Sequence, residues 1–178
     1  MIKGALVGIM FLVLCTTAFA VTAVEGKIEK IDHKAKIIVV KTVDGAEHTF
    51  HVSTRTIVHG TEKAGAATQD AFRGLKEGSA VVVHYSGRGT EETAEEVDHV
   101  GEDGLKTAEG IVTQLDRGAK TLAVKTADGS NETFRIADHA AEDGGKDITE
   151  GAEKSAKVTV YYSEQAGQKV AHFFKKAL

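Results

Sequence analysis

Apolar and polar side chains alternate along several short segments of this chain with a period of two residues. Because the side chains of a β-strand point in turn to its two faces, such alternation predicts strands. Turn residues, mainly glycine and aspartate, bound each segment. In the first half the pattern predicts five strands, over residues 24–32, 36–43, 46–52, 79–86 and 93–100.

The second half repeats this order. A shift of 84 positions aligns residues 24–58 with 108–142, and the shift falls to 77 at the fourth strand, which is predicted at 156–163. The fifth strand is predicted at 167–174. The repeat indicates two small domains of one kind in place of one medium domain.

Two turns recur with the strands. The dipeptides Asp44-Gly45 and Asp128-Gly129 are strong β-hairpin signals between the second and third strands. In the turn after the first strand, Gly118 matches Lys34, which predicts a backbone with positive φ at this position in both halves.

Three strands, a helical connection and two further strands is the order of an OB-type barrel. We therefore expect an all-β protein with small helical connections near 69–73 and 138–143, built as two tandem five-stranded OB-like β-barrels after an N-terminal signal segment. An SH3-like barrel or a flatter sandwich would give a similar pattern and stays open. The expected division is a signal peptide over 1–20, a first β-barrel domain over 21–100, a short linker over 101–107 and a second β-barrel domain over 108–178.

Comparing the two halves separates inward from outward positions. Positions that are apolar in both copies are predicted to face the barrel cores: Ile38/Leu122, Val40/Val124, Phe50/Phe134, Val52/Ile136, Val81/Val158, Val83/Val160 and Tyr85/Tyr162. The outward positions Ile37, Val39 and Val82 are apolar in the first half only. We predict that these three form an interaction patch, covered by the other domain or by a second protomer, which favours a protein partner or self-association.

The N-terminus has the pattern of a secretory signal. Lys3 is followed by the apolar stretch Ala5 to Leu14 and by the small-x-small site Ala18-Phe19-Ala20. We expect cleavage after Ala20 and a periplasmic or extracellular protein. The alternative is an uncleaved anchor, which is the one case in which we expect a membrane contact.

Charge argues against several classes of partner. The formal net charge is −4, and acidic and basic residues are interspersed, so no nucleic-acid partner is expected. The single cysteine, Cys15, lies in the signal segment, so the mature chain has neither a thiol nor a disulfide.

Eight histidines are the candidate chemistry-bearing residues. Neutral imidazole is a common transition-metal ligand, but the chain has no His-x-His pair. At a shift of 73, Val97-Asp98-His99 aligns with Val170-Ala171-His172, so His99 and His172 are the candidate metal ligands. His84 matches Tyr161 and is expected to be exposed. Hydrogen-bonded histidines at a barrel rim are the plainer interpretation, so no cofactor is expected and a bound transition metal stays open.

No catalytic constellation is recognised. The sequence has no nucleophile elbow and no glycine-rich phosphate loop, and the acidic pair Glu95-Glu96 lacks the spacing of a calcium loop. We therefore expect no enzyme and no catalytic residues, and we expect those acids to be solvated.

One resemblance covers nearly the whole mature chain. Glu-Gly, then Asp, then Lys-x-x-x-Val-Lys-Thr-x-Asp-Gly, then Thr-Phe, then a Val-rich strand ending in Tyr-Ser resembles the small exported OB-like domains of unknown function that bacteria carry singly or in tandem. The resemblance implies a fold and export. The periplasmic copper- and silver-binding small barrels of efflux systems have a similar strand order but use methionines and a tryptophan. Here Met1 and Met10 precede the cleavage site and there is no tryptophan.

These features together predict a non-enzymatic exported binding or envelope-structural module built from two small β-barrels. The alternative is histidine-dependent transition-metal binding or buffering in the periplasm.

Overall fold

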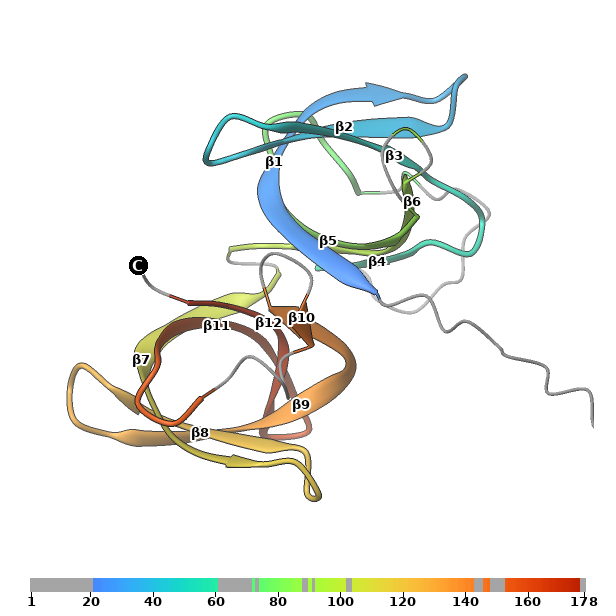
Figure 1. Ribbon diagram of the computed structural model, residues 1–178. Coiled ribbons are helices and arrows are strands. Elements are labelled where there is room, and N and C mark those ends of the chain that lie inside the picture. The colour runs from blue at the N-terminus through green and yellow to red at the C-terminus, as the bar shows by residue number, and fades with distance from the viewer. Residues whose placement is uncertain are drawn as a thin grey trace, which may run out of the picture.

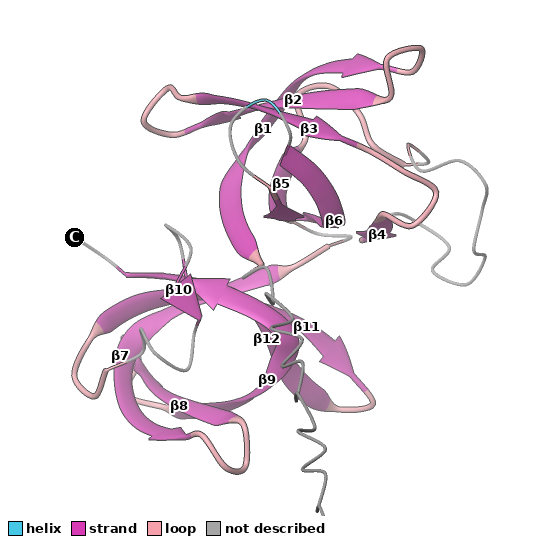
Figure 2. Ribbon diagram, turned by 45° about the vertical axis from the view of Figure 1, so that its right-hand side comes forward, coloured by secondary structure: helices cyan, strands magenta, loops and turns pink. Residues whose placement is uncertain are grey.

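The computed structural model describes residues 21–60, 72, 74–87, 90, 92–101, 104–142, 146–147 and 153–176. This part of the chain is all-β, apart from one residue of 3-10 helix at Thr90 (Figure 2). A helix long and apolar enough to cross a membrane is absent from it. The predicted signal peptide, and most of the connection that holds the first predicted helical piece, lie outside the described residues.

The first sheet closes into a five-stranded barrel (Figure 1). Its strands run in the order β3-β2-β1-β5-β6, and a parallel pairing of β3 with β6 closes the ring. A short sixth strand, β4, also pairs in parallel with β6, on the edge that β3 uses and opposite β5. The bounds are β1 Thr22–Asp32, β2 Ile37–Thr42, β3 Glu47–His51, β4 Ile57–His59, β5 Ala80–Ser86 and β6 Glu92–His99.

The second sheet closes in the same way. Its ring is β9-β12-β11-β7-β8, closed by the pairing of β8 with β9, and the short β10 extends it beyond β9. We expected a helical connection near 138–143. This prediction is wrong for residues 138–142, which belong to β9. The bounds are β7 Lys106–Asp116, β8 Thr121–Thr126, β9 Asn131–Glu142, β10 Lys146–Asp147, β11 Lys157–Gln165 and β12 Gln168–Lys176.

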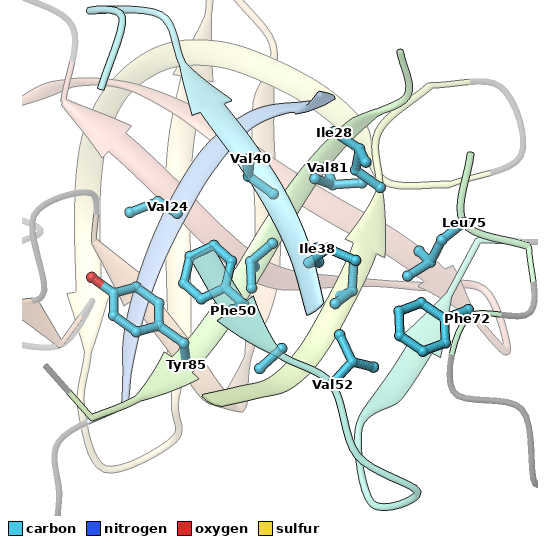
Figure 3. Close-up of a cluster of buried hydrophobic side chains, with 13 residues drawn as sticks. Val24, Ile28, Ile38, Val40, Phe50, Val52, Phe72, Leu75, Val81 and Tyr85 are labelled. Atoms are coloured by element: carbon cyan, nitrogen blue, oxygen red, sulfur yellow. The ribbon is translucent and has the colours of Figure 1, made fainter. Parts of the chain in front are cut away.

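Each barrel has its own apolar core. All seven predicted core pairs are buried, one member of each pair in each barrel. In the first barrel Phe50 packs against Tyr85 with ring centroids 5.0 Å apart (Figure 3). Phe72 and Leu75, from the connection before β5, close the far end of this core.

The turn after the first strand differs from the prediction. The residues with positive φ are Lys36 and Lys120, at 56° and 50°, and neither Lys34 nor Gly118 has a positive φ. The carboxylate of Asp32 accepts backbone hydrogen bonds from Lys34 and Ala35, so the side chain of the first turn residue organises the loop. The residue with a left-handed backbone is therefore the last one before the second strand of each barrel, Lys36 before β2 and Lys120 before β8.

Both barrels carry β-bulges at matching places. The register of β1 on β2 shifts between Ile28 and Lys30, and the register of β7 on β8 shifts between Val112 and Gln114. A second pair of bulges lies on the last strand of each barrel, where Glu95 and His172 are the extra residues.

These registers replace the alignment of His99 with His172. Val81 lies opposite His99 on β6, and its counterpart Val158 lies opposite Lys176 on β12. The shift of 77 therefore continues through the last strand, so His99 corresponds to Lys176 and His172 corresponds to Glu95. The two bulges lie at the same place and leave the shift unchanged, so the alignment at a shift of 73 matched residue types, Val-x-His, and not the strand register.

The two barrels share a buried apolar cluster. Ala23 and Val82 of the first barrel pack with Tyr161 and Phe173 of the second, and Leu105 joins them from the connection. The backbone NH of Leu105 donates to the carbonyl of His99 over 2.6 Å. We call this set of five residues the interbarrel cluster.

Candidate metal centre

The outer face of β4, β6 and β5 gathers polar side chains beside the interbarrel cluster. On β6, Glu96 and Asp98 are two residues apart, so both point away from the barrel core while Val97 points into it. In the strand register, His59 of β4 is the partner of Asp98, and His84 of β5 is the partner of Glu96. Three adjacent strands thus present two carboxylates and two imidazoles on one face.

The distances make a compact group. One ligand atom from each of His59, Glu96 and Asp98 lies within 4.8 Å of the others. The Nε2 atom of His59 is 3.1 Å from Oε1 of Glu96. The Nε2 atom of His84 is 3.4 Å from Oδ2 of Asp98. Atoms spaced in this way could converge on one ion with small side-chain movements.

Two members of the group are buried without hydrogen bonds. Asp98 is 0% exposed and His84 is 1% exposed. Among the described residues, neither carboxylate oxygen of Asp98 and neither ring nitrogen of His84 has a hydrogen-bond partner. Buried polar groups are normally paired, so these atoms require a partner of another kind.

The second barrel contributes His172, which is 8% exposed. Its Nδ1 atom is 3.7 Å from Oε1 of Glu96, and its ring centroid is 6.3 Å from that of His59. Its Nε2 atom is 2.9 Å from Oγ of Ser163. The bulge on β12 gives His172 this direction, because it is the extra residue with no partner on β11.

The protonation of the group follows from these contacts. Hydrogen bonding to Glu96, together with the negative charges of Asp98 and Glu96, raises the pKa of His59 despite partial burial. For Glu96, burial alone would raise the pKa, but hydrogen bonds from His172 and His59 outweigh it and hold the pKa well below the ordinary value of 4.5. Glu96 is therefore a carboxylate at neutral pH and can act as a metal ligand.

The donor set favours a particular class of ion. Imidazole nitrogens and carboxylate oxygens suit divalent zinc, nickel, copper or manganese, whereas monovalent copper and silver prefer thiolate and thioether sulfur. The described residues contain neither cysteine nor methionine. The two carboxylates also bring negative charge, which a divalent cation would offset.

The predicted metal ligands lie apart. His172 lies beside the group, with its Nδ1 atom 3.7 Å from Oε1 of Glu96, whereas His99 lies on the opposite face of β6 from Asp98, beside Val97. His99 is half-buried, and the burial lowers its pKa although it hydrogen-bonds the backbone of Gly74.

The three residues of the predicted interaction patch also lie in separate places. Val82 lies in the interbarrel cluster. Ile37 and Val39 are half-buried on β2, which β1 separates from β5, and they do not belong to that cluster.

Sequence reasoning missed His59, His84, Glu96 and Asp98. The expectation that His84 is exposed is wrong, as is the expectation that Glu96 is solvated, since that residue is 8% exposed. One signal was present: Tyr161, the match of His84, is an aromatic residue on an outward position. An aromatic residue there indicates a covered face, and a covered face buries its polar neighbours too.

No protein-family model matches this chain, and no curated protein matches it. Among solved structures, the crystal structure of Ag(I)CusF is similar to part of the chain, with a TM-score of 0.35 and 15% sequence identity. The similarity covers 41% of this chain and 97% of that chain. A likeness at this TM-score carries no functional argument.

Proposed function

We propose that this protein is a non-enzymatic exported module that binds one divalent transition-metal ion between its two barrels. The observation that carries the proposal is Asp98, a fully buried carboxylate without a hydrogen bond among the described residues, set beside Glu96 and His59. Export rests on the signal pattern of residues 1–20.

The energetics support an ion at this position. Removing a carboxylate from water costs several kcal/mol even after the protein relaxes, unless charge and hydrogen bonds compensate. The imidazole of His84 at 3.4 Å compensates in part but makes no hydrogen bond with Asp98. A metal ion bound to Asp98, Glu96 and His59 would supply the missing partner beside two buried carboxylates, where its attraction to them is strengthened, while the exposed side chain of His59 borders solvent.

The roles of the residues follow from their atoms. His59, Glu96 and Asp98 would hold the ion with one ligand atom each. His84 would orient Asp98, as groups behind a metal ligand commonly do. Three protein ligands plus a fourth donor fit the tetrahedral coordination of zinc.

The test is zinc binding by the full chain, measured by titration calorimetry, with the substitution Asp98→Asn. We expect one zinc ion per chain in the unmodified protein, and at least about a tenfold loss of affinity in D98N. Because binding to the folded state alone stabilises it, zinc should raise the melting temperature of the unmodified protein and barely affect that of D98N.

Glu95→Gln provides the matched control. Glu95 is on the same strand but is exposed, and it accepts a hydrogen bond from Ser86 over 2.7 Å instead of joining the group. E95Q should bind zinc like the unmodified protein. Equal zinc affinity in D98N and E95Q, or no stoichiometric binding of zinc, nickel or copper, would refute the proposal.

A further inference from the structure

His172 is held at the metal centre by the packing of the second barrel. Its neighbour Phe173 is fully buried in the interbarrel cluster, 5.2 Å from the ring of Tyr161 between centroids. The next residue, Phe174, is buried in the core of the second barrel. Two buried aromatic residues therefore fix the backbone that carries the imidazole.

Ser163 sets which nitrogen of His172 faces the first barrel. In a neutral imidazole one nitrogen carries hydrogen and the other carries a lone pair. Without an ion, the Nδ1 hydrogen points to Oε1 of Glu96, 3.7 Å away, and Nε2 accepts from Oγ of Ser163. An ion at Nδ1 would favour the other tautomer, in which Nε2 donates to Oγ of Ser163 and the lone pair of Nδ1 is free to bind. This arrangement, with the outer nitrogen hydrogen-bonded, is the usual one for a metal-binding histidine.

The equivalent bulge of the first barrel makes a different contact. The corresponding residues there are Ser86 and Glu95, which hydrogen-bond each other at the surface. Only the second barrel has an imidazole at this position, and only its bulge faces the other barrel's carboxylates.

We propose that Nδ1 of His172 is the fourth ligand, so that the bound ion bridges the two barrels and stabilises their docked arrangement. This inference rests on the proposed function, since His59, Glu96 and Asp98 all belong to the first barrel. The second barrel takes part in binding only through His172.

A bridging ion would add to the contacts that already join the barrels. Besides the interbarrel cluster, the ion pairs that cross between described residues are Lys175 with Glu25 at 3.3 Å and His172 with Glu96. An ion that binds the docked state better than the separated state shifts the population toward docking. By the same linkage, docking raises the affinity for the ion.

The experiment uses ¹⁵N-labelled full chain and zinc as the probe, with the histidine ring nitrogens observed by NMR. We expect the Nδ1 resonance of His172 to shift on zinc binding together with the ring resonances of His59. In His172→Asn we expect zinc still to bind, with affinity reduced about tenfold or more. Zinc should slow amide exchange in β11 and β12 in the unmodified protein and leave it unchanged in H172N.

A second variant covers the case in which H172N folds poorly. Ser163→Ala leaves the imidazole in place and removes the group that orients it, so a smaller loss of affinity is expected. If the His59 resonances shift while those of His172 do not, the bridge is refuted and the proposed function stands. If no histidine resonance shifts and no heat of binding is seen, the proposed function itself fails.

Discussion

The extra residue in the bulge of each last strand determines which contact the bulge makes. Glu95 and His172 occupy the same place in their barrels, and each contacts a serine at the same position of the preceding strand. The backbone geometry is therefore shared, and the side chain alone makes one bulge a surface hydrogen bond and the other a contact between barrels.

Asp128 shows how a side chain supports a hairpin turn. Its carboxylate accepts hydrogen bonds from the hydroxyl of Thr126 and from the backbone and hydroxyl of Ser130, which lower its pKa from the ordinary 3.8 to about 2. A group with a lowered pKa in the folded state stabilises the fold above its unfolded pKa, and this stabilisation disappears as the pH falls through the folded pKa.

We therefore predict that Asp128→Asn destabilises the protein at pH 7 and that its difference from the unmodified protein shrinks as the pH falls from about 4 to about 2. Carboxyl ¹³C shifts measured against pH check the pKa directly. In Thr126→Val the pKa of Asp128 should return toward 3.8. An Asp128 pKa near 3.8 in the unmodified protein would contradict this account.

At the scale of elements, one polar side-chain contact joins the closing strands of each barrel. It lies beside Phe50 in the first barrel and beside Phe134 in the second, and the two contacts use different residue types. His48 and Glu92 approach to 3.2 Å in the first barrel, and Lys169 and Glu132 approach to 2.7 Å in the second. In the second barrel the ammonium also lies 5.1 Å from the ring centroid of Tyr162. The acidic residue is therefore on the last strand of the first barrel, β6, but on the third strand of the second barrel, β9.

The close approach of the first two strands explains the glycine near the start of each barrel. A Cβ on Gly26 or Gly110 would overlap the backbone of the neighbouring strand, at Lys41 or Lys125. Only glycine allows the strand to curve this tightly over its partner.

We predict that Gly110→Ala lowers the free energy of unfolding by about 1–3 kcal/mol, because the overlapping atoms belong to backbone that cannot move aside. Denaturant titration measures the change. The control is Gly118→Ala, whose Cβ would meet Oδ1 of Asp116 at an ordinary 3.5 Å and should have little effect. Equal losses in the two variants would contradict overlap as the cause, because replacing glycine by alanine reduces the entropy of the unfolded chain and by itself stabilises the fold.

At the scale of the whole molecule, the interbarrel cluster couples two units that each have a core of their own. Phe173 is at its centre and does not belong to the core of the second barrel, which uses Phe174 instead. Removing the ring of Phe173 should therefore act mainly on the contact between barrels.

We predict that Phe173→Ala, in the metal-free protein, lowers amide protection in β5 of the first barrel, where Val82 loses its cover. Hydrogen exchange measures this strand by strand. Phe173→Leu keeps most of the apolar area and should retain most of the protection. Unchanged β5 protection in F173A would mean that the cluster does not couple the barrels.

Much of the fold could be read from the sequence. Strand alternation, the Asp-Gly turns and positions apolar in both halves identified the two five-stranded barrels and all seven core pairs. These features are local or repeated, and inward-facing residues of a small barrel have few alternatives to apolar side chains. His172 was a candidate only through its alignment with His99 at a shift of 73, which the strand register replaces.

The candidate metal centre could be recognised only in the tertiary structure. His59, Glu96 and Asp98 lie on strands that pair in parallel across a long connection, and His172 is contributed by the other barrel through a bulge. Neither the parallel register nor the bulge leaves a periodic signal, so the sequence alone predicted that His84 is exposed and that Glu96 is solvated. The sequence determined which residues face each core, and the packing of one barrel against the other decided which polar residues lost water and came together.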